Sequence, residues 1–220
     1  MDDTAEPRDA TPTPDPGAAP GDLGGLLTLI RSRGYERRAE PFQLSSGGHS
    51  HDYVDLRRAV ARGADLAVAA RAVLAHLDAA DVTFEAIGGM TMGADPVAHA
   101  VALIGGLEWF SVRKALKGHG RQQRVEGASL SDSKPIVLFE DTVSTGGSIF
   151  EAYEVLATTG ATVVAACTLL DRGDTAAPRF AALGVEYFPL LTYQDLGIEP
   201  IVPVTPDQGD APAPGDTSAG

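Results

Sequence analysis

Apolar side chains recur at helical spacing in several separate segments of the chain. In residues 22–33 and 64–79 they return every three or four positions, which places them on one face of a helix. Three more segments are predicted as helices: 95–103, 148–159 and 175–183. Pro96 falls in the first turn of its helix, where proline is tolerated, and Gly34 is a plausible stop for the first helix.

Short apolar segments lie between these helices and predict strands: 84–87, 109–112, 135–139, 162–170 and 185–191. Segment 135–139, Pro-Ile-Val-Leu-Phe, is apolar on both faces, as expected for a strand buried in a parallel sheet. Alternating strands and helices predict an α/β fold, a parallel sheet flanked by helices with right-handed crossovers. Ligands in such folds bind at the carboxyl ends of the strands.

The two ends of the chain have a different character. Residues 1–21 and 203–220 are acidic and rich in proline, and neither shows apolar periodicity. Such segments bury too little surface to offset the entropy of ordering the chain, so we predict two disordered tails. One domain is predicted between them, over residues 22–202.

Charge and composition narrow the function. The formal net charge is -13, although residues 23–202 hold 21 acids and 16 bases, a net of -5. This acidity argues against a nucleic-acid-binding protein. No apolar stretch reaches 18 residues and no signal peptide is evident, so no membrane association is expected. A single cysteine excludes an internal disulfide and suits the reducing cytoplasm.

Several residues with chemical potential are interpreted as structural. Cys167 lies in an apolar run, which favours a buried core thiol over a catalytic one. Trp109 and Phe110 are expected in the core, and His76 and His99, within predicted helices, are expected to pack or face solvent. The group His49, His51 and Asp52 fits no dependable metal-ligand spacing.

The strongest chemical signal follows the apolar segment 135–139. It reads Glu140-Asp141-Thr142-Val143-Ser144-Thr145-Gly146-Gly147-Ser148. Backbone N–H groups of such a loop and the N-terminus of the next helix can surround a phosphate, and the glycines allow close approach. The two carboxylates would repel phosphate, so ribose hydroxyls or Mg²⁺ are their natural partners. A plain strand–turn–helix with a hydroxyl N-cap would not explain the paired acids.

A second signal is a basic cluster in an otherwise lysine-poor chain. Lys114 and Lys117 are two of only three lysines, and Arg113 and His119 stand beside them. The segment contains glycines and follows a predicted strand, so we expect a mobile basic loop. Such a loop can close over a diphosphate and stabilise negative charge. A merely solvated loop is the alternative.

These two segments together resemble those of the orotate phosphoribosyltransferases, within the type I phosphoribosyltransferase family. The acidic loop is similar to the signature that binds 5-phosphoribosyl 1-diphosphate (PRPP). The segment Pro41-Phe42-Gln43-Leu44-Ser45-Ser46-Gly47-Gly48-His49-Ser50 resembles the family's cover over the base, although a hairpin turn would also account for its glycines. Segment 87–96 resembles the family's pyrophosphate-side loop. The resemblance spans residues 24–193.

The resemblance implies a small hood over the base site, Mg²⁺ as cofactor, a homodimer, and specific roles. PRPP would be bound by Arg113, Lys114, Lys117, His119 and residues Glu140, Asp141, Thr142, Val143, Ser144, Thr145, Gly146, Gly147 and Ser148. Lys117 and Asp141 would be catalytic. Orotate would be bound by Ser45, Tyr53, Ser144 and Arg172, with Mg²⁺ held mainly by PRPP near the acid pair. Some family members carry lysine at the positions of Ser45 and Met92, and both charges are missing here.

The implied activity is transfer of phosphoribose from PRPP to orotate, which gives orotidine 5-monophosphate in pyrimidine biosynthesis. Two alternatives stay open. A phosphoribosyltransferase for another base, such as a purine, would share the acidic loop but would not require Arg172 to face a carboxylate. A non-catalytic regulator that senses PRPP would keep the fold without needing Lys117.

Overall fold

A computed structural model describes residues 22–44, 48–115 and 124–202. The helices within them are α1 (Leu23–Leu29), α2 (Leu56–Ala59), α3 (Gly63–Ala79), α4 (Asp95–Gly105), α5 (Gly147–Ala157), α6 (Ala176–Ala182) and α7 (Tyr193–Leu196). The strands are β1 (Tyr35–Gln43), β2 (His49–Val54), β3 (Ala86–Met90), β4 (Glu108–Val112), β5 (Val125–Gly127), β6 (Pro135–Val143), β7 (Thr162–Asp171) and β8 (Glu186–Thr192). The predicted tails, 1–21 and 203–220, lie outside the described residues.

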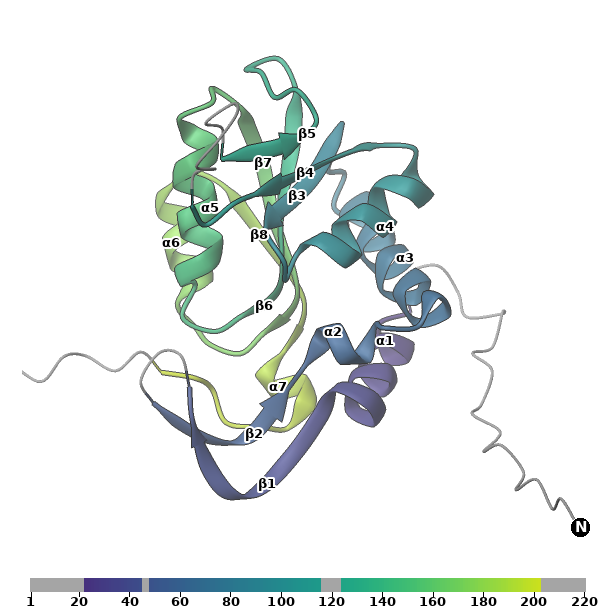
Figure 1. Ribbon diagram of the computed structural model, residues 1–220, viewed down its shortest axis with the longest axis vertical. Helices are drawn as coiled ribbons and strands as arrows, with labels where there is room; N and C mark the ends of the chain where they lie inside the picture. Colours follow the sequence, from purple (N-terminus) through teal and green to yellow (C-terminus); the bar gives the residue numbers. More distant parts are fainter. Residues whose placement is uncertain (1–21, 45–47, 116–123, 203–220) are drawn as a thin grey trace, which may run out of the picture.

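Six strands form the central sheet in the order β5-β4-β3-β6-β7-β8 (Figure 1). All neighbours in it are parallel except β4 and β5. The chain runs from β3 to β4 on one side and then crosses to β6 on the other side of β3. The strand order therefore reverses between β3 and β6, and a crevice for ligands is expected at their carboxyl ends. The predicted α/β class is confirmed.

Helices cover both faces of the sheet (Figure 1). Side chains from α1, α3 and α4 pack with one face of it in a core that includes Val73, Val101 and Phe139. Side chains from α5 and α6 form a second core on the other face, with Phe110 and Phe180 fully buried. Burying apolar side chains on both faces holds the strand ends rigidly, which positions the residues that follow them.

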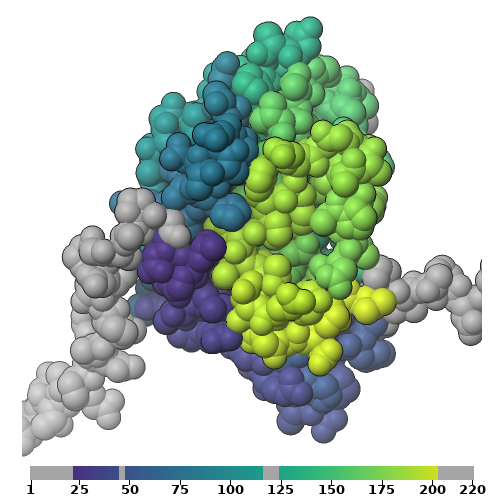
Figure 2. Space-filling view, turned by 180° about the vertical axis from the view of Figure 1, so that it is seen from behind, coloured from purple at the N-terminus to yellow at the C-terminus, as the bar shows by residue number. Residues whose placement is uncertain are grey.

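Strands β1 and β2 form a separate antiparallel hairpin (Figure 1). Only one of its residues, Asp52, is buried. Its carboxylate accepts hydrogen bonds from the Tyr35 hydroxyl at 2.9 Å and the Arg37 guanidinium at 2.8 Å. In Figure 2 the purple segment that begins with α1 lies beside the yellow segment of β8 and α7, and Arg31 donates a hydrogen bond of 2.7 Å to the carbonyl of Asp195.

The five predicted helices and five predicted strands are all present, with shifted ends. The first helix is α-helical to Leu29 and continues as a π-helical turn to Gly34. Gly34 is the last residue of this turn, and the backbone of Asp55 packs closely against it, since a Cβ at Gly34 would lie 2.9 Å from the Asp55 carbonyl oxygen. Strand β6 continues to Val143, four residues past its predicted end. Elements α2, α7, β1, β2 and β5 were not predicted.

The expectation that Trp109 is a core residue is wrong, whereas Phe110 is fully buried. Successive side chains of a strand point to opposite faces of the sheet. Phe110 faces the side of α5 and α6, and Trp109 faces the side of α4, where His99 packs against it with ring centroids 4.4 Å apart. This covering is incomplete, so 42% of Trp109 stays exposed.

Candidate active site

The acid pair of β6 lies at the reversal point of the sheet. Glu140 and Asp141 are still within the strand, paired with β7, and their carboxylates approach the turn after β3. A Cβ on Gly93 would lie 2.8 Å from Asp141 Oδ1 and 3.1 Å from Glu140 Oε1. The turn after β3 therefore meets the acid pair closely, and a side chain at position 93 would have to displace one or both carboxylates.

Burial raises the pKa of both carboxyl groups. The pKa of Glu140 rises to about 8, first because of desolvation and then because of the neighbouring Asp141 charge. Desolvation also raises the pKa of Asp141, which its backbone hydrogen bonds oppose. Glu140 Oε2 is buried without a hydrogen-bond partner among the described residues. A hydroxyl donor or a cation would satisfy this oxygen, so the pair is suited to a sugar or a metal.

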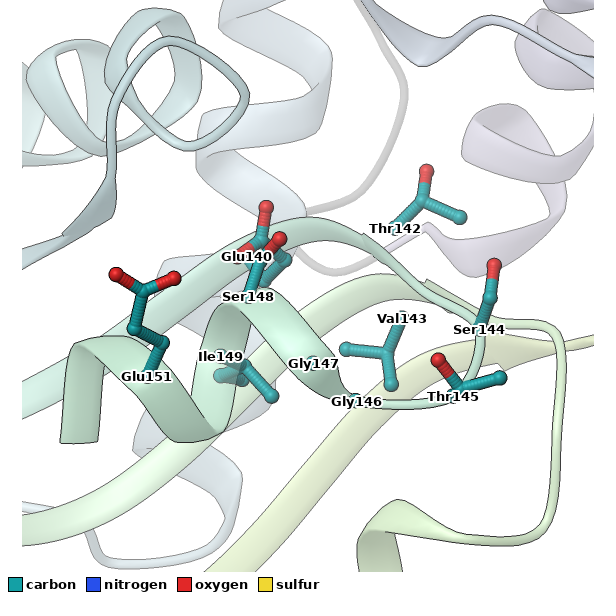
Figure 3. Close-up of a pocket in the computed structure, with 10 residues that line it drawn as sticks. All are labelled: Glu140, Thr142, Val143, Ser144, Thr145, Gly146, Gly147, Ser148, Ile149 and Glu151. Atoms are coloured by element: carbon teal, nitrogen blue, oxygen red, sulfur yellow. The ribbon is translucent and has the colours of Figure 1, made fainter. Parts of the chain in front are cut away.

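The loop after β6 lines a cavity of about 430 Å³ at the start of α5. Figure 3 shows Thr142 and Ser144 projecting from the loop, while Ser148 lies close to Glu140. Gly146 is the N-cap of α5 with φ of 82°, a conformation natural to glycine, and no side chain caps the helix. The first N–H groups of α5 lack a side-chain acceptor, which is the arrangement that binds phosphate.

The predicted phosphate-loop residues are thereby brought together. Glu140, Thr142, Val143, Ser144, Thr145, Gly146, Gly147 and Ser148 all line this cavity, joined by Ile149 and Glu151. The side chain of Val143, however, is 2% exposed and packs in the core beside α5. Val143 can therefore serve a ligand through its backbone but not through its side chain.

A second cavity, of about 580 Å³, is lined by both members of the acid pair. Its lining unites three predicted site residues that are far apart in sequence, namely Tyr53, Lys114 and Asp141. The remaining lining residues are Val54, Asp55, Leu56, Arg57, Met90, Thr91, Met92, Gly93, Glu140 and Ser148. Because Glu140 and Ser148 line both cavities, the two form adjacent compartments around one acid pair.

Arg172 is held rigidly just past β7. Its backbone N–H donates to the Val143 carbonyl at 2.7 Å, and its carbonyl accepts from Ile201 at 2.6 Å. Its side chain is 4% exposed, and Nε and Nη2 have no hydrogen-bond partner among the described residues. Burial lowers the pKa of the guanidinium, and the charge of Asp52 opposes this. A buried cation with unused donors is suited to a carboxylate ligand.

The predicted basic residues are only partly described. Arg113 turns toward β5, with Nη1 at 3.1 Å from Glu126 Oε1, and it lines neither cavity. Ser45, Lys117 and His119 lie outside the described residues. The side chain of Arg124 donates to the carbonyls of Arg113 at 2.8 Å and Lys114 at 3.0 Å, and so connects the residues on either side of the undescribed stretch 116–123.

Sequence reasoning missed three residues of the site. Glu151, on α5, lines the cavity at the start of this helix and accepts a 2.5 Å hydrogen bond from Arg124. Asp55 and Arg57 line the second cavity. The run Asp55-Leu56-Arg57-Arg58 resembles the start of a short helix, and Asp55 does cap α2 by accepting from the Arg58 N–H at 3.1 Å.

No helix in the described parts of the chain is long and apolar enough to span a membrane. Within the same residues there is no group of three or more histidine, cysteine, aspartate or glutamate side chains that could hold a metal ion. A metal in this site would need further ligands from a bound molecule.

The fold and the site together define a class of protein. An acid pair lies near the carboxyl end of β6, a helix without a side-chain cap follows this strand, and the turn after β3 packs against the acids. This is the arrangement of a type I phosphoribosyltransferase. No family model matches the chain, whereas individual relatives do.

Curated relatives specify the family. The chain is 44% identical over 182 residues to the orotate phosphoribosyltransferase of Streptomyces avermitilis, covering 80% of this chain and 97% of that protein. It is 36% identical to that of Rhodopirellula baltica over 188 residues, covering 81% and 96%. At this level of identity and coverage, the chain belongs to the orotate phosphoribosyltransferase family.

Solved structures agree. The orotate phosphoribosyltransferase of Mycobacterium tuberculosis in complex with PRPP is 34% identical, covers 80% of this chain and 99% of its own, and has a TM-score of 0.66. An adenine phosphoribosyltransferase of Thermoanaerobacter pseudethanolicus, 13% identical over 76% of this chain and 99% of its own, has a TM-score of 0.58 and shares the fold alone.

Proposed function

We propose that this chain carries out the reaction after which its relatives are named. Phosphoribose is transferred from PRPP to N1 of orotate, giving orotidine 5-monophosphate and pyrophosphate, a step of pyrimidine biosynthesis. The observation that carries the proposal is the acid pair of β6 beside the uncapped α5, in a chain 44% identical to an orotate phosphoribosyltransferase.

PRPP would lie across the acid pair. Its 5-phosphate fits the cavity at the start of α5, where backbone N–H groups and the hydroxyls of Thr142, Ser144 and Thr145 are available. Glu140 and Asp141 would accept hydrogen bonds from the ribose hydroxyls, which gives the unpartnered Glu140 Oε2 a donor. The diphosphate would extend into the second cavity, past Gly93 and Lys114.

The donor set also fits Mg²⁺. This ion prefers oxygen ligands and binds through one or two carboxylates together with substrate phosphates. Glu140 and Asp141 present buried carboxylates at the point where ribose and diphosphate would meet. When bound, Mg²⁺ would supply positive charge that neutralises the diphosphate. The ion would be held mainly by PRPP, with the acid pair nearby.

Orotate would meet the buried guanidinium of Arg172. A planar guanidinium pairs with a carboxylate through two parallel hydrogen bonds, and Arg172 has two buried nitrogens unused. The carbonyl of Ser144 packs against Gly173, the residue after Arg172, so Ser144 would contact the same ligand. Tyr53, whose ring packs edge-on against Phe42 at 5.5 Å, would form the hood with Ser45.

In the reaction, the bond from ribose C1 to the diphosphate oxygen breaks and a bond from C1 to orotate N1 forms. The electron pair of the broken bond leaves with pyrophosphate. Lys117, with Arg113, Lys114 and His119, would stabilise its negative charge. Asp141 would stabilise the positive charge that develops on the ribose. At neutral pH orotate is ionised at its carboxyl group and N1 still carries a proton. This proton leaves N1 as the C1–N1 bond forms and passes to solvent or to the departing pyrophosphate.

We propose that the protein forms a homodimer and acts in the cytoplasm. The charge of -13 suits a soluble cytoplasmic enzyme, and a single cysteine suits a reducing compartment. The mass in solution, measured over a range of concentrations, tests the assembly. A monomeric mass at every concentration with full activity would contradict it.

A panel of bases tests the activity. Purified protein, PRPP and Mg²⁺ would be incubated separately with orotate, uracil, adenine, hypoxanthine and guanine. We expect consumption of orotate alone, and its loss in Lys117→Ala. Consumption of a purine instead would favour the other-base alternative and refute the assignment of Arg172. Saturable PRPP binding without turnover of any base would favour the regulator.

A further inference from the structure

We infer that Arg57 is a further substrate-binding residue, which holds the diphosphate of PRPP from the side of α2. The inference rests on the proposed function and adds to it a residue that neither motif contains. Four observations support it: the place of Arg57 in the cavity, the charge balance there, the availability of its guanidinium and the anchoring of its helix.

Arg57 lines the same cavity as the acid pair and the turn after β3. Lys114 reaches this cavity from the end of β4, whereas Arg57 reaches it from α2, which packs against β6. Strand β3 lies between β4 and β6 in the sheet. The two cations therefore approach the cavity from different elements, and an extended diphosphate between them would have charge-assisted contacts at both ends.

The carboxylates of this cavity outnumber its lysine, so a bound diphosphate would need a second cation. Its lining includes three carboxylates, those of Asp55, Glu140 and Asp141. Lys114 and Arg57 are the basic residues among the described lining, and Met92, 68% exposed beside them, brings no charge. A diphosphate next to three carboxylates would be repelled, and Lys114 alone would offset only part of this repulsion.

The guanidinium of Arg57 is available to a ligand. Its side chain is 58% exposed, and the nearest ion pair described for it is loose, with Nε at 3.9 Å from Asp55 Oδ1. That oxygen already accepts the Arg58 N–H that caps α2. Burial raises the pKa of Asp141, and the positive charge of Arg57 partly opposes this rise, as expected for a cation near the acid pair.

The backbone of Arg57 is fixed although its side chain is exposed. On either side of it along α2, Leu56 and Ala59 are buried, 2% and 0% exposed. Arg58 is also exposed and is adjacent in sequence but does not line the cavity, because successive residues of a helix point about 100° apart. Arg58 is thus a matched control for the same change of charge.

Two substitutions test the inference, Arg57→Gln and Arg58→Gln, with Arg57→Lys as the conservative variant. Calorimetry with Mg²⁺ would measure binding of inorganic pyrophosphate and, separately, of ribose 5-phosphate, and kinetics would give KM for PRPP and for orotate. We expect Arg57→Gln to weaken pyrophosphate binding and raise KM for PRPP about ten- to a hundredfold, as for loss of a charge-assisted hydrogen bond. Arg57→Lys should recover part of this loss.

Other quantities should change by no more than about twofold: KM for orotate and ribose 5-phosphate binding in Arg57→Gln, and all constants in Arg58→Gln. Unchanged pyrophosphate binding in Arg57→Gln would overturn the inference. So would weakened binding of ribose 5-phosphate alone, because Arg57 would then act through Asp141. A wild-type protein that binds neither PRPP nor pyrophosphate would instead refute the proposed function, and the inference with it.

Discussion

At the scale of single residues, the site depends on charges that burial holds in place. Glu140 is 7% exposed and Arg172 is 4% exposed, and each has a polar atom without a partner among the described residues. Leaving such atoms unpaired costs stability, about 1–3 kcal/mol or more for a charged group. A bound ligand would pair these atoms and remove the cost. Substitutions at these positions should therefore raise the stability of the free protein or leave it unchanged while they lower activity.

Glu140→Gln should stabilise the protein at alkaline pH. The pKa of Glu140 is raised from 4.5 to about 8, so the folded state keeps a proton that the unfolded state releases. The stability contributed by this group is therefore present below pH 4.5 and is lost as pH rises to about 8. The variant should gain up to about 1.4 kcal/mol per pH unit over that window.

Urea unfolding of the free protein at pH 5, 6.5 and 8 checks this. Glu154→Gln, an exposed carboxyl on α5, provides the same change of charge and should show much less dependence on pH. A gain in Glu140→Gln that does not grow with pH would contradict the raised pKa. Turnover should fall in this variant, because ribose would lose a carboxylate.

Arg172→Lys should weaken orotate binding specifically. Lysine keeps the charge but loses the planar pair of donors, so we expect KM for orotate to rise about tenfold or more while KM for PRPP changes little. Arg71→Lys, an exposed change on α3, is the control. An equal rise in both KM values would indicate a general disturbance of the site.

Sequence alone identified residues that are contiguous and missed those that are assembled by folding. Eight of the nine residues predicted as a phosphate loop line one cavity, and sequence could single them out because carboxylates, hydroxyls and glycines follow one another there. Arg57 reaches the cavity only through the packing of α2, which no local pattern encodes. Trp109 was misplaced because burial on a strand depends on how fully a helix covers that face.

At the scale of elements, the site depends on how closely β3 approaches its neighbours. A Cβ on Gly88 would lie 1.9 Å from the Phe110 carbonyl oxygen, and one on Gly89 would lie 1.8 Å from that of Phe139. No side chain can be accommodated at either distance. These glycines let β3 sit between β4 and β6, and the turn that meets the acid pair follows directly.

Gly88→Ala and Gly89→Ala should each destabilise the protein strongly, by about 3 kcal/mol or more, because strand backbones must move apart. Gly63→Ala is the matched substitution in open space at the start of α3, where no atom lies within 4 Å of the added Cβ. It should be neutral or stabilise by up to about 1 kcal/mol. Thermal and urea unfolding measure all three.

Arg124 links the β4–β5 edge to α5, since it bonds two carbonyls of the basic segment and the Glu151 carboxylate. Arg124→Gln should cost about 1–2 kcal/mol of stability. The exposed pair Lys134–Glu108, at 2.8 Å, lacks such carbonyl bonds, so Lys134→Gln should cost under about 1 kcal/mol. Equal costs would show that Arg124 acts only as a surface ion pair.

Element positions were predicted better than element ends. Amphipathic and apolar runs identified the main helices and the parallel strands. The end of β6 was missed because its last four residues are held by pairing with β7, as in Val143 opposite Asp171. The hairpin of β1 and β2 was considered only as an alternative explanation of the glycines between them, and its strands were not predicted, because they are largely exposed and lack alternating burial.

At the scale of the whole molecule, bound PRPP would connect several elements of the fold. PRPP would contact β6, α5, the turn after β3 and the end of β4, which carry the two adjacent cavities. A ligand that binds only the folded state stabilises it by about 2.7 kcal/mol at a concentration of one hundred times its Kd. The whole domain, rather than one loop, should therefore respond to PRPP.

Thermal unfolding with and without PRPP and Mg²⁺ checks this response. For a domain of this size we expect a rise in Tm of about 5 °C or more at a hundredfold excess over Kd. Asp141→Asn should diminish the rise, whereas Gly63→Ala should leave it unchanged. An equal rise in wild type and Asp141→Asn would place PRPP elsewhere.

The burial of Cys167 supplies a probe of the native state. This thiol, the sole cysteine in the chain, lies on β7, between β6 and β8, with 0% exposure, and desolvation raises its pKa far above the usual value. Both effects suppress its reaction with disulfide reagents until the sheet opens. The rate at which Cys167 is labelled therefore measures how often the sheet of the wild-type protein opens at β7. A ligand bound at the carboxyl ends of the strands should lower this rate.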